Sequence, residues 1–268
     1  MSKHMSKQSS NELDFETLIS ELAENSDSIT KGRFKFRELT MKEQRKILNM
    51  GFNPIEIPAR IDNIFNEYIK EGVELTDSMV DITQEITIDL KPFLIMQLRT
   101  LTLGDLYVDI QSDKKYTLYN VTEEDLENVV EPEIIEFNNF IIRLSAPTLA
   151  KDTSVNSQLL VELGNFKGKL TDSDYGKVAD IYQVYELMKY ITEIELNGNV
   201  FDFDRCPVNK KNKIINSLPQ KIIGKINDFI EKVKANEEKA MTIVDPVTNK
   251  SSKVDMSTLF FVRNAREK

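Results

Sequence analysis

A long helical segment that runs without a linker into a β-hairpin narrows the fold of this chain more than any other part of its sequence. The segment "LTDSDYGKVADIYQVYELMKYI" begins with Thr171 and Asp174 at the spacing of a helix-capping pair. Its apolar residues recur along one face, at Val178, Ile181, Tyr182, Tyr185 and Met188. The following "TEIELNGNVFDFD" alternates in polarity and turns at Asn197–Gly198–Asn199, which is typical of a hairpin. A helix joined directly to an antiparallel hairpin predicts a mixed α+β fold.

The N-terminal third is expected to be mainly helical. After a strand at "RFKFREL", Thr40 and Glu43 predict a capped helix that ends at Gly51. Two further helices are expected over ranges that end before a glycine, 58–71 and 89–103. Their inward-facing residues are Ile61, Ile64, Phe65 and Tyr68 in the first, and Phe93, Leu94 and Leu98 in the second.

Short β-rich segments occupy the middle of the chain, namely "LYVDIQ", "KYTLYN", "EIIEF" and "NFIIRLS". Thr122 and Asp125 predict a brief capped helix between the second and third of them. After the 192–204 hairpin we expect two helices, the second capped by Ser217 and Gln220, and then a second hairpin at "MTIVDPVTNKSSKVDM". The fold class is therefore α+β, with N-terminal helices, short antiparallel strands in the middle, and C-terminal hairpins and amphipathic helices. The apolar stripe of that second helix is Ile222, Ile226, Phe229, Ile230 and Val233.

The expected domain organisation is one main domain with two appendages. Residues 1–32 form a flexible N-terminus that carries an acidic amphipathic helix at 11–24 and a linker, "NSDSITKG". Residues 33–263 form the α+β domain, with a subdivision near 146–157 where the sequence becomes polar. Residues 264–268 are a charged tail.

The charge balance and the rarity of two residue types restrict the possible functions. The chain has a formal net charge of -9, which argues against binding nucleic acid by charge alone. A lysine cluster at Lys210, Lys211 and Lys213 is the one local exception, and a solvated helix face explains it as well. The single cysteine fits a reducing compartment, and the single histidine, His4, lies in a polar terminus that could not hold a hydrolase triad. With no apolar run long enough to span a bilayer, we expect a soluble, intracellular protein.

The segment "FDFDRCP" contains the one pattern that suggests catalysis or metal binding. Asp202 and Asp204 could hold a divalent ion in a sugar-transferring enzyme, because carboxylates are hard oxygen ligands. A strand explains all four residues without any metal, with both aspartates on a solvent-exposed face and Phe201 and Phe203 on a buried face. Cys206 precedes Pro207, the expected first residue of a helix, and no histidine is near to act as its base.

Four stretches, in their order and spacing, carry a resemblance to a known family. They are "FKFRELTMKEQRKIL", "ITIDLKPFLIMQLRTLTLGDLY", "YELMKYITEIELNGNVFDFD" and "IINSLPQKIIGKINDFIEKV" with "VDMSTLFF" beyond it. Together they resemble the bacteriophage T4 baseplate hub protein family, the small hub and hub-assembly proteins of contractile phage tails. The resemblance covers most of the chain from Phe34 to Phe261 and does not extend to the acidic helix before it.

The resemblance implies a non-enzymatic structural or assembly role, with no catalytic residue and no cofactor. Such a protein would bind other hub and tail proteins in the host cytoplasm and either remain in the virion or act transiently, with its oligomeric state left open. The candidate partner-binding residues are Phe15, Leu18, Ile19 and Leu22 in the acidic helix, and Leu259, Phe260 and Phe261 near the C-terminus. Each set either packs on the main domain or waits for a partner. A metal-dependent transferase using Asp202 and Asp204, and a nucleic-acid-binding accessory protein, are the alternatives.

Overall fold

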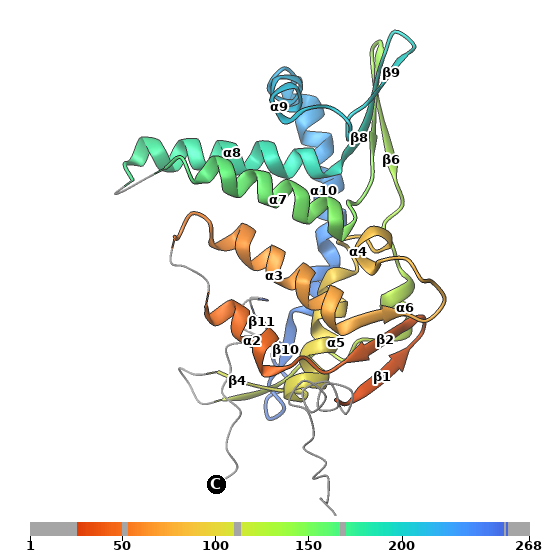
Figure 1. Ribbon diagram of the computed structural model, residues 1–268, viewed down its shortest axis with the longest axis vertical. Helices are drawn as coiled ribbons and strands as arrows, with labels where there is room; N and C mark the ends of the chain where they lie inside the picture. The colour runs from red at the N-terminus through yellow and green to blue at the C-terminus, as the bar shows by residue number, and fades with distance from the viewer. Residues whose placement is uncertain (1–25, 50–52, 110–113, 167–169, 255, 257–268) are drawn as a thin grey trace, which may run out of the picture.

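The computed structural model describes residues 26–49, 53–109, 114–166, 170–254 and 256. Within them, helices and short strands mix along the whole chain, which confirms the α+β class (Figure 1). The helices are α2 Met41–Leu48, α3 Ile57–Gly72, α4 Ile82–Glu85, α5 Lys91–Leu103, α6 Glu123–Glu127, α7 Leu149–Leu163, α8 Asp172–Tyr190, α9 Val208–Asn216 and α10 Gln220–Ala240. The strands are β1 Ser28–Lys31, β2 Phe34–Arg37, β3 Val73–Leu75, β4 Leu106–Val108, β5 Lys115–Thr117, β6 Glu133–Phe137, β7 Phe140–Leu144, β8 Ile191–Leu196, β9 Asn199–Asp202, β10 Thr242–Val244 and β11 Ser251–Lys253.

The strands of the described residues form three small antiparallel sheets. The first has the order β1-β2-β3, the second β11-β10-β5-β4, and the third β6-β7-β8-β9. The third sheet continues directly from α8 and projects from one end of the molecule, whereas β4, β10 and β11 lie at the other end (Figure 1). The helix-to-hairpin junction predicted from the sequence therefore builds the projecting end of the protein.

Two hydrophobic clusters form the core, and helices α3 and α10 contribute to both. One cluster centres on α5 and includes Phe65 and Ala240, and the other centres on α7 and α8 and includes Ala59 and Phe229. Helix α10 runs along the long axis of the molecule from one cluster to the other (Figure 1). All five residues of its predicted stripe are buried, at Ile222, Ile226, Phe229, Ile230 and Val233.

Side-chain caps start three helices where the sequence predicts them. The hydroxyl of Thr40, Thr122 or Thr171 accepts a hydrogen bond from the backbone N–H three residues on. In each case the acidic side chain of that later residue accepts from the backbone N–H of the threonine. The expected stop of α2 at Gly51 lies outside the described residues, as do the 11–24 helix and the 257–263 segment.

One prediction of irregular chain is wrong, and one helix was not predicted. The segment expected to be a linker contains strand β1, whose side chains are mostly exposed and which is held by backbone pairing to β2. The polar stretch near 146–157 contains the first turns of α7, whose buried residues include Asp152 and Asn156. Polar side chains on a buried face conceal the apolar period by which a helix is recognised. The subdivision expected there stays a prediction.

The start of α10 also differs from expectation. The Ser217 hydroxyl donates to the Lys213 carbonyl at 2.8 Å and so serves the end of α9. Pro219 then begins α10 without any side-chain cap. Pro207 likewise stands at the N-cap of α9, so this helix begins at Val208, one residue later than predicted. Each proline fixes its own φ and makes a helix start possible without a hydroxyl cap.

Candidate functional site

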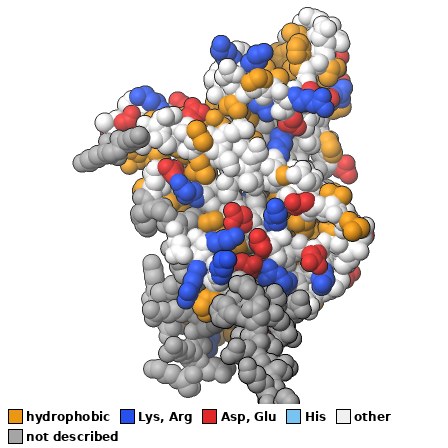
Figure 2. Space-filling model, in the orientation of Figure 1, with side chains coloured by type: hydrophobic (Ala, Val, Ile, Leu, Met, Phe, Trp, Pro, Cys, Tyr) orange, Lys and Arg blue, Asp and Glu red, His pale blue; other side chains and the backbone are white. Residues whose placement is uncertain are grey.

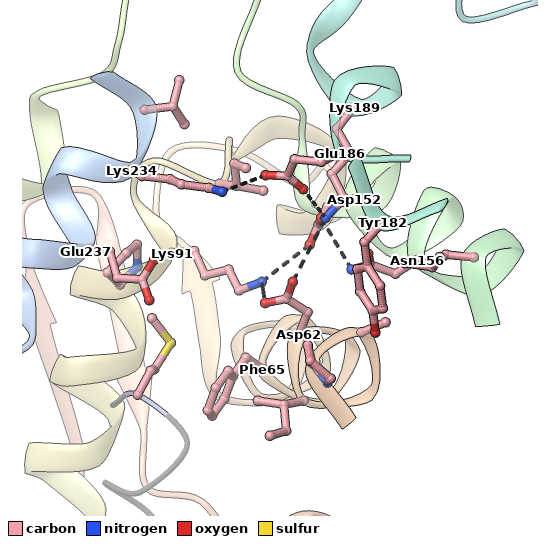
Figure 3. Close-up of a pocket in the computed structure, with 18 of the residues that line it drawn as sticks. Asp62, Phe65, Lys91, Asp152, Asn156, Tyr182, Glu186, Lys189, Lys234 and Glu237 are labelled. Atoms are coloured by element: carbon pink, nitrogen blue, oxygen red, sulfur yellow. Dashed lines mark hydrogen bonds and ion pairs between the residues drawn. The ribbon is translucent and has the colours of Figure 1, made fainter. Parts of the chain in front are cut away.

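A cavity of about 640 Å³, with both apolar and charged residues in its wall, opens between helices α3, α5, α7, α8 and α10 (Figure 3). Its charged residues come one or two from each helix: Asp62, Lys91, Asp152, Glu186, Lys189, Lys234 and Glu237. Asp62 lies on α3 and Asp152 on α7, so the cavity sits where the two hydrophobic clusters meet. We call the linked residues Asp62, Lys91, Asp152, Glu186, Lys189 and Lys234 the interhelical network.

The interhelical network is a continuous chain of ion pairs centred on Asp152. The Nζ atom of Lys189 lies 2.7 Å from Asp152 Oδ1, and that of Lys91 lies 3.3 Å from Asp152 Oδ2. Lys91 also reaches Asp62 at 2.9 Å. At the other end Glu186 pairs with Lys189 at 3.3 Å and with Lys234 at 2.9 Å.

Burial and neighbouring charges shift the pKa values of these groups in opposite directions, and the effect of the charges is the larger. Burial alone would raise the pKa of Asp152, but Lys91 and Lys189 hold it well below its usual range. Burial would lower the pKa of Lys189, but Asp152 and Glu186 raise it above its ordinary value. The amide nitrogen of Asn66 adds a 2.8 Å bond to Asp152 Oδ2. Asp152 and Lys189 therefore stay ionised near neutral pH, and the ion pairs of the network join five helices.

The aspartates of "FDFDRCP" do not share one site. Asp202 pairs with Arg205, with Oδ2 and Nε 3.0 Å apart, and Asp204 pairs with Lys151 at 2.6 Å. The Cys206 thiol lies 3.4 Å from the backbone oxygen of Asp202. In the described part of the chain, no group of three or more His, Cys, Asp or Glu residues could hold a metal ion.

The prediction that Phe201 and Phe203 share one buried face is wrong. Phe203 is 1% exposed, whereas Phe201 is 51% exposed. Strand β9 ends at Asp202, so the alternation that would place both rings together stops before Phe203.

The lysine cluster is divided by burial. Lys210 and Lys213 are exposed, but Lys211 is 8% exposed, with its Nζ 5.3 Å from the centre of the Phe203 ring. Because Lys211 is buried, the three lysines do not form one exposed basic face.

An apolar surface covers the projecting end of the β6-β7-β8-β9 sheet. Residues that pair directly across strands share a face. One such row runs Ile135, Ile142, Ile194 and Phe201, and the next runs Phe137, Phe140 and Leu196. The rows are buried at Ile135 and Ile142 and become exposed at Phe201 and Leu196. We call Phe137, Phe140, Leu196 and Phe201 the sheet tip.

The two turns beside the sheet tip support each other. Asn197 and Gly198 both have positive φ, of 50° and 76°, as a two-residue hairpin turn requires. The Asn139 amide nitrogen of the neighbouring turn donates to Asn197 Oδ1 at 3.0 Å. Hydrophobic side chains are visible at this end, with lysine and arginine side chains over α9 beside them (Figure 2). The sheet tip is therefore a braced apolar surface with a charged margin.

The comparison with known proteins decides the class of protein to which this surface belongs. A family model described as "T4 bacteriophage base plate protein" matches residues 21–261. The chain belongs to this family. No curated protein and no solved structure matches it.

As a T4-type baseplate protein, the chain has a structural role in the phage tail baseplate and interacts with other phage tail proteins. The match confirms the family resemblance and spans every described strand and helix from β1 to β11. No described helix is both long and apolar enough to cross a membrane.

The residues predicted to bind partners are not those of the sheet tip. The predicted set, Phe15, Leu18, Ile19 and Leu22 with Leu259, Phe260 and Phe261, lies outside the described residues. Phe201 was predicted to be buried and Leu196 was not singled out, yet both are exposed on the sheet tip. The one feature of the sequence that could have indicated this exposure is the length of the β8–β9 hairpin, which carries an apolar face beyond the helices that could cover it.

Proposed function

We propose that this baseplate protein is a hub or hub-assembly subunit that works through protein–protein contacts and catalyses no reaction. The single observation that carries the proposal is the sheet tip, where Phe201 is 51% and Leu196 is 42% exposed on a strand face that is buried further in. A contiguous apolar surface with a polar margin is characteristic of a protein-binding site.

The sheet tip is suited to a partner that buries aromatic side chains. The centres of the Phe137 and Phe140 rings are 5.4 Å apart, and both rings are half-buried, so they form a contiguous aromatic surface beside the exposed Leu196. Aromatic side chains at the centre of an interface commonly supply most of its binding energy. Strand β9 is an edge strand of the described sheet, so its outer backbone groups are also free to pair with a partner.

The proposed partners are other hub subunits, and the proposed place of assembly is the host cytoplasm. The protein would meet other hub subunits in the host cytoplasm during tail assembly and either stay in the virion or leave after assembly. The terminal residues Phe15, Leu18, Ile19, Leu22, Leu259, Phe260 and Phe261 stay candidates for additional contacts.

A gene deletion tests the proposed role. Cells infected with the deleted phage should yield heads without finished tails in electron micrographs, and tagged protein should co-purify with other tail proteins. Finished, normal tails in the deletion lysate would contradict the proposal.

A further inference from the structure

A second cavity, of about 650 Å³, lies between the N-terminal turns of α7 and α9, away from the interhelical network. Lys151, Lys211 and Asp204 are the charged groups among its described lining residues. Its other lining residues include the hydroxyl groups of Ser145, Thr148, Ser154 and Thr192 and the apolar side chains of Ala146, Ala150 and Met188. We call it the lysine pocket.

The lysine pocket holds more positive than negative charge. Lys151 Nζ lies 2.6 Å from Asp204 Oδ1 and donates to the Ile191 carbonyl at 3.1 Å. Lys211 donates to the Asp204 backbone oxygen at 3.2 Å and faces the Phe203 ring. Among the described residues no carboxylate forms an ion pair with Lys211. The carboxylate of Asp204 is therefore the one negative group in a described lining that contains two lysines.

Burial makes that excess charge unfavourable in the free protein. The side chain of Lys151 is 18% exposed, and Lys211 as a whole is 8% exposed. Burial lowers the pKa of Lys151 even though Asp204 opposes the shift, and the nearby charge of Lys211 lowers it further. Lysine is rarely buried unless it is paired. An anion placed beside Lys211 would relieve the imbalance.

The N-terminus of α9 adds to the positive potential. Pro207 stands at its N-cap without any side-chain hydrogen bond, and both Pro207 and Val208 line the pocket. The first turn of a helix carries partial positive charge and exposes N–H donors.

We propose that the lysine pocket binds a carboxylate group presented by an acidic segment of a partner protein, with Lys211 as the principal contact. A single carboxylate balances the two lysines and Asp204, whereas a phosphate dianion would leave the pocket negative. The volume accommodates a whole side chain with flanking backbone. The apolar lining residues Ala146, Ala150 and Val155 suit the methylenes of a glutamate. The inference rests on the proposed function only in taking a protein as the source of the carboxylate.

Peptide titration of the full chain, followed through backbone amide chemical shifts in NMR spectra, tests this inference without any baseplate partner. The probes are acetyl-Gly-Glu-Gly-amide, its Gln counterpart, acetyl-Gly-Gly-Gly with a free C-terminus, and inorganic phosphate. We expect the Glu peptide to shift the amides of Thr148, Lys151, Thr192 and Val208, and the Gln peptide to leave them unchanged. Tighter binding of the free C-terminus would identify a chain end as the source of the carboxylate.

Two variants make the test specific. Lys211→Met should weaken binding of the Glu peptide about tenfold or more, because a charged hydrogen bond is lost. Lys213→Met, on the same helix but exposed, is the matched control and should bind like the unaltered chain. Asp204→Asn should bind the peptide more tightly, because it removes the competing carboxylate.

Three results would overturn the inference: equal binding of the Glu and Gln peptides, tighter binding of phosphate than of carboxylate, or equal losses in Lys211→Met and Lys213→Met. A failure in this titration leaves the deletion experiment on tail assembly unaffected, so the two proposals can fail separately.

Discussion

Lys189 and Asp152 form an ion pair of 2.7 Å in which the side chains are only 7% and 2% exposed. Lys253 and Glu238 form a pair at the same distance of 2.7 Å, but with side chains 62% and 72% exposed. Equal distances in such different surroundings have different energetic consequences, because water screens the exposed charges and leaves the buried ones dependent on each other. The buried pair also joins α7 to α8 at the meeting point of the two hydrophobic clusters.

Removing the carboxylate of the buried pair should destabilise the fold strongly. Asp152→Ala leaves Lys91 and Lys189 without their shared partner, so we expect the free energy of unfolding to fall by about 3–5 kcal/mol. The control Glu238→Ala should cost less than about 1 kcal/mol. Urea unfolding followed by circular dichroism measures both, and similar losses in the two variants would refute a stabilising network.

The same carboxylate predicts a pH dependence of stability. Because the pKa of Asp152 is lowered in the folded state, the unfolded state binds more protons at acid pH. Its contribution is complete above the ordinary carboxyl pKa and is lost as the pH falls below about 4. The urea midpoint of Asp152→Asn should therefore fall less between pH 6 and pH 3 than that of the unaltered chain. Parallel pH profiles would contradict the assigned pKa direction.

Two hydroxyl groups that look alike in the sequence should respond differently to removal. Thr171 caps α8 in a reciprocal capping box, so Thr171→Ala should lower the free energy of unfolding by about 1 kcal/mol. Ser217 bonds back to the preceding helix and caps nothing in α10, so Ser217→Ala should change stability by less than about 0.5 kcal/mol. Thermal unfolding distinguishes them, and a larger loss in Ser217→Ala would restore the predicted capping pair.

Two helical glycines offer a test of local packing. A Cβ added at Gly72 would lie 2.7 Å from a methyl carbon of the buried Leu98, so Gly72→Ala should destabilise by about 1–3 kcal/mol. A Cβ at Gly224 of α10 meets nothing within 4 Å, so Gly224→Ala should stabilise by about 0.5–1 kcal/mol. Shifts of the melting temperature in opposite directions are expected, and a stabilising Gly72→Ala would show that Leu98 can move aside.

Periodicity predicted the parts of this fold in which apolar residues face the core. The stripes of α8 and α10 and the hairpin at Asn197–Gly198 follow from spacing and turn chemistry alone. Helix α7 was missed because its buried face includes the polar residues Asp152 and Asn156. Asp152 is paired with the distant Lys91 and Lys189, and the amide of Asn156 donates to Asp152. Strand β1 was missed because its stability comes from backbone pairing with β2.

The candidate sites were harder to predict for the same reason. The interhelical network joins residues from five helices that are far apart in the sequence, and no local pattern marks them. The exposure of Phe201 depends on how far the hairpin extends beyond the helices, which only the packed structure determines. Family membership, by contrast, was accessible from the order of segments along the chain.

If the sheet tip joins this subunit to the baseplate, a substitution there should cause a position-specific loss of assembly. Phe201→Glu places a charge on the apolar face and should weaken partner binding about 30-fold or more, as loss of an interface hot spot does. Val247→Glu alters a side chain that is 91% exposed, in the β10–β11 hairpin at the opposite end of the molecule, and is the matched control (Figure 1). Both variants should fold with unchanged melting temperatures, because neither side chain is buried.

The most direct measurement is complementation of the gene deletion with each variant, scored as finished tails in electron micrographs. We expect that Val247→Glu restores finished tails and Phe201→Glu does not, although both proteins accumulate to equal levels. Finished tails in normal number with Phe201→Glu would contradict it.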